Sequence, residues 1–393
     1  MESSMTLLSA HIQFLDTQLA LIHIPLSLYA NFLQAILQLL LPNEGRTDFA
    51  SSNGAVRAPR GWPYEHPFVN ISITHIECSI VCSRTLAREL FAPVRDSLDA
   101  AARSQVSITN EDSIVMQVDG EGLDAGQRVL ELTSPLALAG ISIFFITTYF
   151  SDYILVPLRC RGQVVHALEE RGFAFEQHTS TYVNPSHGRN HSSTSSFETQ
   201  SPGTPPPATI SELQTRTFAT LKRRNIVPTV NPSLRLIQCA GRKDPSRTGN
   251  SNGNRNSTTS AADDALHLGL VKCLITPPCP RFLSLTLTDT EPASLLLDHT
   301  LLPNFAQDVL LGSKDDFLIP ITLDLRELPL ESTGIVCGVA GRLVGGTAQG
   351  ALENSVEMSY LSTARAGTVM VGEDELHRAL AALRGTENGV VPD

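Results

Sequence analysis

The sequence lacks the short motifs that mark most nucleotide-dependent and hydrolytic enzymes. Its 393 residues contain no phosphate-binding loop, no dinucleotide-binding GxGxxG after a strand, no HExxH and no nucleophile elbow. Each motif fixes backbone N–H groups, metal ligands or a nucleophile in one geometry, so its absence argues against the corresponding chemistry. The 11 histidines are scattered, and His11, His23 and His75 lie in strand patterns, where core or surface histidines are common. We therefore expect a protein that is not an enzyme and uses no cofactor or metal.

The chain also lacks the cysteine spacing of a metal site or a disulfide framework. Its seven cysteines are an odd number and include no CxxC pair. Cys78 and Cys82 lie in the apolar run ITHIECSIVCS, where a thiol acts as a small hydrophobic side chain. No Lys or Arg precedes Arg46, so the basic start of a secretory signal is missing. These features predict a reducing, cytoplasmic location.

One long apolar stretch, Ile24 to Pro42, needs a separate explanation. Its polar residues fall at spacings of four, three and four, so they form one narrow stripe on a helix from Ser27 to Leu41. This pattern favours a buried domain helix over a membrane span, and we expect no membrane partner. The formal net charge of −11 disfavours nonspecific binding to nucleic acid. Basic residues gather between positions 210 and 260, a segment that we interpret as a solvated, disordered loop.

A segment that occurs twice, 215 residues apart, is the strongest positive feature of the sequence. ISIFFITTYFSDYILV (Ile141 to Val156) aligns without gaps with VEMSYLSTARAGTVMV (Val356 to Val371), and the alignment places Asp152 against Gly367. Each copy has two apolar runs around turn residues, and an amphipathic pattern follows it. This order predicts a strand pair and then a helix. The duplication points to a tandem array of small α+β modules.

The rest of the chain divides into further rounds of the same pattern. Apolar content of 42% and charged content of 18% are typical of folded protein. Phe68 to Ser83 alternates like a strand pair, and Ala125 to Ala139 has a helical period. Segments rich in Ser, Asn, Gly and Pro cannot bury enough surface to offset their ordering entropy, which predicts disordered insertions. The predicted division is module 1 (1–105, with a loop insertion at 43–67), module 2 (106–175), a low-complexity linker (176–231), module 3 (232–312, with an insertion at 241–260), module 4 (313–386) and a tail (387–393).

A turn before an apolar helix is the best binding site that the residues themselves suggest. ELPLESTGIVCGVAG places Glu331, Ser332, Thr333 and Gly334 just before a helical pattern. A helix N-terminus with a capping hydroxyl and free N–H groups suits the carboxylate of a small ligand. Plain helix capping explains the same residues and remains the alternative.

These segments together resemble the CASTOR family, cytosolic arginine sensors that act on the TOR kinase pathway through a GATOR complex. The resemblance is carried by ISIFFITTYFSDYILV, LPLESTGIVCGVAG, MSYLSTARAGTVMVGEDELHRALAAL and RFLSLTLTDTEPASLLLD. It implies an α+β fold of four ACT-type (ferredoxin-like βαββαβ) modules arranged as two pairs, with disordered insertions. It also implies an amino acid held between modules 2 and 4.

The resemblance assigns the ligand site residue by residue. Ser142 and Ile143 would contact the ligand from the strand after the second module's helix, and the turn from Pro329 to Gly334 with Val336 would embrace the amino-acid head. The complete implied set is Ser142, Ile143, Pro329, Glu331, Ser332, Thr333, Gly334, Val336, Thr363, Ala364 and Gly367.

Three positions depart from the family pattern. Ser332 stands where the family has Glu, Ala364 stands where it has an aromatic residue, and Gly367 stands where it has the Asp that pairs with the cationic end of the ligand. A charge-assisted hydrogen bond contributes about 1.5–3 kcal/mol, so its loss makes arginine a poor ligand. Glu331 directly precedes Ser332. If the turn shifts by one residue, Glu331 would take the place of the family's Glu.

Three functions fit these observations. The first is a non-catalytic cytosolic sensor that binds an amino acid, arginine or another, and regulates TOR-pathway signalling through a protein partner, with a homodimer as the implied assembly. The second is an ACT scaffold that has lost its ligand, and the third is an ACT regulatory subunit of an amino-acid metabolic enzyme. A cavity between modules 2 and 4 favours the sensor, whereas a pocket filled by side chains favours the scaffold.

Overall fold

The computed structural model describes residues 10–41, 66–119, 125–175, 207, 209–242, 261–345 and 356–385. Most of the insertion at 43–67, the linker up to residue 206, most of the insertion at 241–260 and the predicted tail lie outside the described residues. Within the described chain no helix is both long enough and apolar enough to cross a membrane.

A closed ring of 12 antiparallel strands forms the centre of the molecule. The pairing of Leu236 with Leu318 closes the ring between β10 and β14. In order around the ring, the strands are β10 (Leu236–Gly241), β12 (Ser294–Asp298), β11 (Leu283–Thr288), β2 (Phe68–Ile73), β3 (Cys78–Ser83), β1 (His11–Ile24), β5 (Ser113–Asp119), β7 (Asp152–Pro157), β6 (Phe144–Thr147), β15 (Met358–Ser362), β16 (Ala366–Gly372) and β14 (Leu318–Asp324).

Four two-residue strands extend this sheet at its margins. β4 (Ser107–Ile108) and β8 (Ala174–Phe175) pair with β1, β9 (Thr229–Val230) pairs with β14, and β13 (Leu310–Leu311) pairs with β10. The β1–β8 pair is parallel.

The predicted set of four separate ferredoxin-like modules is therefore wrong. β1 is one continuous strand, whose Leu19–Ile24 pair with β3 and whose His11–Leu15 pair with β5, so the first two predicted modules share it. The halves of the chain are joined by the β2–β11 and β6–β15 pairs. Unpaired strand edges readily pair with other strands, and here the edges of the units pair with one another and merge into one sheet.

The register of the joining strands shows an internal two-fold relation between the halves. In the β2–β11 pair, Ile71 faces Leu285, and the pairs Val69–Leu287 and Ile73–Leu283 lie symmetrically about it. In the β6–β15 pair, Leu361 faces Ile146, its counterpart in the duplicated segment. The sequence repeat thus corresponds to structural halves that meet at equivalent strands.

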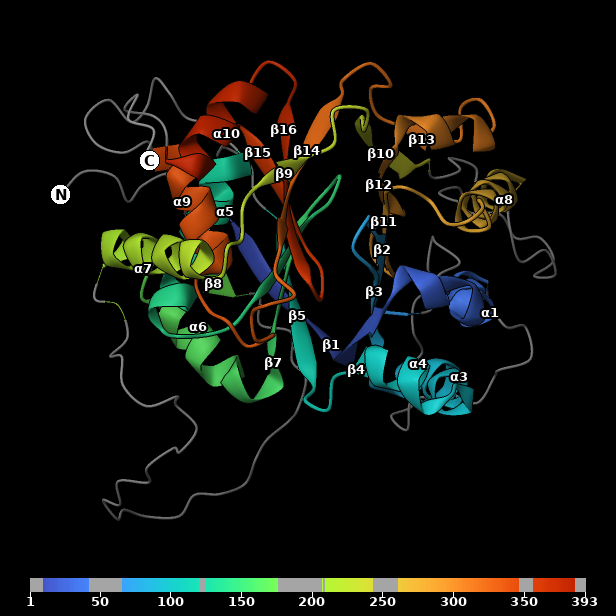
Figure 1. Cartoon of the computed structure of the whole chain (residues 1–393), viewed down its shortest axis with the longest axis horizontal. Coiled ribbons are helices and arrows are strands. Elements are labelled where there is room, and N and C mark those ends of the chain that lie inside the picture. The colour runs from blue at the N-terminus through green and yellow to red at the C-terminus, as the bar shows by residue number, and fades with distance from the viewer. Residues whose placement is uncertain are drawn as a thin grey trace, which may run out of the picture.

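Helices cover two sides of the ring (Figure 1). On one side, α1 (Tyr29–Leu40) and α8 (Ala261–Leu274) pack with the strands around β2 and β11. The shorter elements of this side are η1 (Leu26–Leu28), α2 (Arg84–Leu86), η2 (Ala87–Phe91), α3 (Ala92–Ser97), α4 (Ala100–Gln105) and η5 (His299–Asn304). The predicted helix from Ser27 to Leu41 is present as η1 and α1, and it is buried on its apolar face.

The opposite side carries the other long helices (Figure 1). α5 (Ala125–Leu138) packs against α9 (Ile335–Gly345), and both belong to one apolar cluster with β6, β7, β15 and β16. α6 (Arg161–Glu169), preceded by η3 (Leu158–Cys160), and α10 (Leu376–Arg384) flank them. α7 (Ile210–Arg223) crosses α9, so the segment predicted as a linker contains a docked helix. Thr209 caps it, since the Glu212 N–H donates to the Thr209 hydroxyl at 3.2 Å.

A third apolar cluster fills the inside of the ring between these two sides. Phe68 of β2 and Tyr153 of β7 meet there with ring centroids 5.1 Å apart. Alternation along each strand sends one set of side chains toward a helix layer and the other into the ring. The described strands therefore bury both of their faces.

Candidate functional site

The turn before α9 meets the segment before β6, as the resemblance implies. The Ser332 hydroxyl donates to the Pro329 carbonyl at 2.7 Å, and the Ser332 N–H donates to the same oxygen at 3.0 Å. The Ser142 hydroxyl lies 3.4 Å from the Leu330 carbonyl oxygen and 3.5 Å from that of Ser332. These contacts hold the turn against the start of β6 and place Ile143 and Phe144 beside it.

A small cleft of about 50 Å³ lies at this junction. Pockets for small ligands commonly measure about 300–1,000 Å³, so this cleft is far smaller than such a pocket. Six residues of the implied set line it: Ile143, Pro329, Ser332, Val336, Thr363 and Ala364.

Tyr360 explains why this cleft is small. Its side chain is fully buried, and burial raises the pKa of its phenol above the ordinary value. A Cβ atom added at Gly367 would lie 2.3 Å from the Tyr360 hydroxyl oxygen. The phenol therefore occupies the space in which a side chain at position 367 would stand. Gly367 does not line this cleft, and it serves the packing of Tyr360.

Gly334 is also used for packing. Its φ of +78° is a conformation that glycine adopts most readily, and the added Cβ would lie 3.0 Å from Leu213 of α7. The Thr217 hydroxyl donates to the Gly334 carbonyl at 3.3 Å. At Gly338, one turn further along α9, a Cβ would lie 2.8 Å from Thr217. The glycines thus let α7 approach α9 closely, and Gly334 does not reach either cleft.

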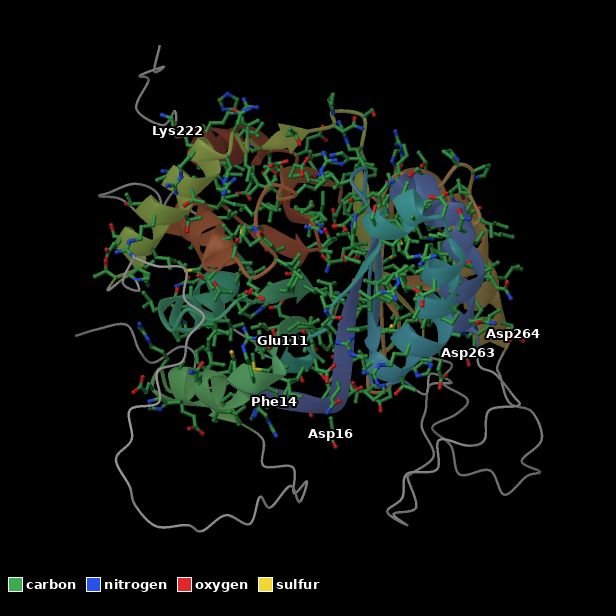
Figure 2. The ribbon with its side chains drawn as sticks, turned by 60° about the horizontal axis from the view of Figure 1, so that its bottom comes forward. Phe14, Asp16, Glu111, Lys222, Asp263 and Asp264 are labelled. Carbon is green, nitrogen blue, oxygen red and sulfur yellow. The ribbon has the colours of Figure 1, made fainter. Side chains whose placement is uncertain are left out.

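A larger cleft of about 580 Å³ adjoins the small one, and Phe144 and Leu330 line both. Ser142, Glu331 and Thr333 of the implied set line the larger cleft. Its other polar wall groups come from β4 and the start of the loop that follows it (residues 107–111), Ser113 of β5, Arg159 of η3 and Arg365 in the β15–β16 turn. Figure 2 shows Glu111 of this loop near the middle of the face that forms the bottom of Figure 1.

Sequence reasoning missed Arg159, Arg365 and the 107–111 loop. Arg365 does lie inside the duplicated segment, where it aligns with Phe150. This difference, a charged residue in one copy and an aromatic residue in the other, was the signal in the sequence that could have drawn attention to Arg365.

A fully buried carboxylate and a partly buried one anchor the two equivalent turns of the duplicated hairpins. Glu77, fully buried in the β2–β3 turn, accepts hydrogen bonds from the Thr363 hydroxyl at 2.7 Å and from the Arg365 N–H. Its other oxygen lies 2.5 Å from His23 Nδ1. The Ala364 N–H donates to the Ser79 hydroxyl at 3.1 Å. The β15–β16 turn is therefore held from inside the ring while Arg365 lines the larger cleft.

Glu291 occupies the equivalent place in the other half. It accepts from the Tyr153 hydroxyl at 2.8 Å, from Gln117 Nε2 at 2.9 Å and from the Ser151 hydroxyl. Burial raises the pKa of the Glu291 carboxyl, although the Ser151 and Tyr153 donors oppose the shift. Burial and the nearby Glu291 carboxyl together raise the pKa of Tyr153 well above its ordinary value.

Asp152, the counterpart of Gly367, is paired inside the protein. Its Oδ2 accepts from Arg128 Nε of α5, and its Oδ1 has no hydrogen-bond partner among the described residues. Burial raises the pKa of this carboxyl, and the charge of Arg128 opposes that rise. The copy that keeps the Asp thus already holds a guanidinium group.

Metal binding finds no support in the part of the chain that the structure describes, where no three His, Cys, Asp or Glu side chains gather at one point. All seven cysteines are free thiols. Burial raises the pKa of Cys82 and Cys239 to about 12 and that of Cys273 to about 11. These thiols remain protonated at neutral pH and act as small apolar core groups.

Residues 108–170 match the ACT domain family. They run from the end of β4 through β5, α5, β6 and β7 to α6, and they carry Ser142 and Ile143 of the implied site. No curated protein sequence matches the chain.

Solved structures give weak likenesses. A protein of Agobacterium tumefaciens is 20% identical, with 43% of this chain and 96% of that chain covered and a TM-score of 0.27. Aspartate kinase from Synechocystis is 12% identical, with 100% and 59% covered and a TM-score of 0.31. The regulatory subunit of aspartate kinase from Thermus thermophilus is 11% identical, with 40% and 95% covered and a TM-score of 0.24. TM-scores this low carry no argument about the present fold, so the comparisons establish an ACT domain match over residues 108–170.

Proposed function

We propose that the chain is a non-catalytic regulatory protein that binds an amino-acid-type ligand beside its ACT-matching segment. The observation that carries the proposal is the convergence of the ACT-matching segment with the turn before α9 around the 580 Å³ cleft. Pockets for small ligands commonly measure about 300–1,000 Å³, so this cleft has the size that the proposal needs.

Regulation of an amino-acid metabolic enzyme is the favoured setting. The ACT domain match over residues 108–170 supports the role of a regulatory subunit. Control of TOR signalling rests on the sequence resemblance alone. The structure offers nothing in its favour, and arginine sensing has lost the Asp on which it would depend. A cytoplasmic location and a homodimer belong to the same proposal.

The ligand-independent scaffold remains a second candidate because of one observation. Tyr360 occupies the space in which a side chain at position 367, the family's Asp position, would stand, and only about 50 Å³ remains in the cleft beside it. A scaffold role predicts that no amino acid binds, although the fold is intact.

Calorimetric titration of the full chain with the twenty amino acids tests the proposal. Saturable binding of at least one of them, with a matching rise in melting temperature, supports a regulatory ligand site. If none of the twenty binds to folded protein, the regulatory proposal fails and the scaffold is favoured. Co-purification with an amino-acid metabolic enzyme, rather than with a TOR-pathway complex, would separate the two regulatory settings.

A further inference from the structure

The larger cleft contains one unpaired cation and one unpaired anion. Its four charged wall residues are Glu111, Arg159, Glu331 and Arg365. Arg159 Nη1 forms an ion pair with Glu111 Oε1, and this pair accounts for two of the four charges. Among the described residues the side chains of Arg365 and Glu331 have no ion-pair or hydrogen-bond partner. The cleft therefore keeps a positive and a negative group for a ligand.

Arg365 is held firmly at its backbone and left free at its side chain. Its N–H donates to the buried Glu77 carboxylate, and its carbonyl accepts from the Leu325 N–H at 2.8 Å. The side chain is partly buried and lines the cleft. The planar guanidinium can bind a carboxylate through two parallel hydrogen bonds.

Apolar and uncharged polar side chains form the rest of the wall. Leu21 and Ile108 line it from β1 and β4, Phe144 and Leu155 line it from β6 and β7, and Leu330 lines it from the turn. The polar wall groups besides the four charges are hydroxyls and an amide, at Ser107, Thr109, Asn110, Ser113, Ser142 and Thr333. A ligand in this cleft would thus meet both charged groups and hydrocarbon.

We infer that this cleft binds an α-amino acid with an apolar side chain, its carboxylate on Arg365 and its ammonium group on Glu331. The inference rests on the proposed function, which it makes more specific. A zwitterion satisfies both unpaired charges at once, and the apolar wall takes the side chain, because burying hydrocarbon is favourable in proportion to its area.

The same charges disfavour other amino acids. The extra guanidinium of arginine would enter a cleft that already holds Arg159 and Arg365, with Glu111 engaged by Arg159. The extra carboxylate of glutamate would leave Glu331 facing a like charge. Like charges held close together cost free energy, more so where water is partly excluded.

Calorimetric titration with L-leucine is the test. We expect saturable binding to the full chain, at least tenfold weaker binding to the Arg365→Gln variant, and equally weakened binding of leucinamide, which has no carboxylate, to the wild-type chain. L-Phenylalanine should bind in the same way, and L-arginine and L-glutamate should bind at least tenfold more weakly than L-leucine. The matched control is Arg378→Gln, on the exposed face of α10, which should bind L-leucine as the wild type does.

The Arg365→Gln variant should melt within a few degrees of the wild type, because the backbone N–H and not the side chain reaches Glu77. The inference is overturned if L-leucine binds both proteins equally, or if L-arginine binds most tightly. In either case some amino acid still binds, and the proposed function stands. Failure of all twenty amino acids to bind would overturn both.

Discussion

Packing of Tyr360 against Gly367 gives the sharpest test of why position 367 carries no side chain. A Cβ at position 367 would lie 2.3 Å from the Tyr360 hydroxyl oxygen and 3.3 Å from the ring carbon that bears it. Real Cβ contacts do not reach 2.3 Å, so Gly367→Ala must displace a fully buried ring. Overpacking of this kind costs about 1–3 kcal/mol in the free energy of unfolding.

Tyr360→Phe removes the hydroxyl group and leaves the ring, so Gly367→Ala should cost much less in that background. We expect a coupling free energy of at least about 1 kcal/mol from the double-mutant cycle, measured by urea-induced unfolding. Gly162→Ala serves as the control, because no heavy atom lies within 4 Å of its added Cβ. Equal costs of Gly367→Ala in both backgrounds would refute the steric argument.

Three further predictions concern buried groups. Arg128→Gln leaves the Asp152 carboxylate buried without its partner and should lower the free energy of unfolding by about 3–5 kcal/mol; a loss below 1 kcal/mol in urea unfolding would contradict the pairing. The pKa of Glu291 is raised in the folded state, so the folded chain binds its proton more tightly than the unfolded chain does, and the contribution of this residue to stability falls as pH rises above the ordinary value of 4.5. Glu291→Gln should abolish that slope in unfolding curves taken from pH 4 to 7, and an unchanged slope would assign it to other groups. A thiol reagent at pH 8 should label the partly exposed Cys160 and Cys279 in native protein and all seven cysteines in urea; native labelling at buried cysteines would contradict the packing.

Local elements were predictable from the sequence because local patterns encode them. The helix over Ser27 to Leu41 and the strand pair over Phe68 to Ser83 follow from apolar periodicity, and the structure has both. The docked helix α7 was missed, since it lies beside a segment whose composition is dominated by Ser, Thr and Pro. Its apolar residues Leu213 and Leu221 are buried, and their role in docking the helix is clear only once α7 is seen to pack beside α9.

Assembly of the strands into one ring could not be predicted in the same way. Alternation identifies a strand and its buried face, but it does not say which other strand edge it will pair with. The closing pair Leu236–Leu318 and the joining pair Ile71–Leu285 connect residues far apart in sequence. The sequence repeat predicted the number of modules, but it did not reveal that β1 is shared by the first two of them.

The candidate site was predictable in part. The structure places Ser142 beside the turn at Ser332, and the roles of these residues in binding stay predictions. The sequence suggested that Gly367 marks a lost contact with the ligand. In the structure, the absence of a side chain at this position makes room for the Tyr360 hydroxyl group. Arg365 was missed because its position depends on Glu77, nearly three hundred residues earlier, and no local pattern encodes that contact.

The shared strand β1 limits how the polypeptide can be divided. A truncation that removed residues 1–105 would take away His11–Leu15, the part of β1 that pairs with β5. It would also remove β2 and β3. The residues that match the ACT domain family would then expose one edge of β5 to solvent and to other chains. Fragments meant to carry the ligand site on their own should therefore retain the first strand, and a nick within it should disturb both helix-covered sides of the ring at once.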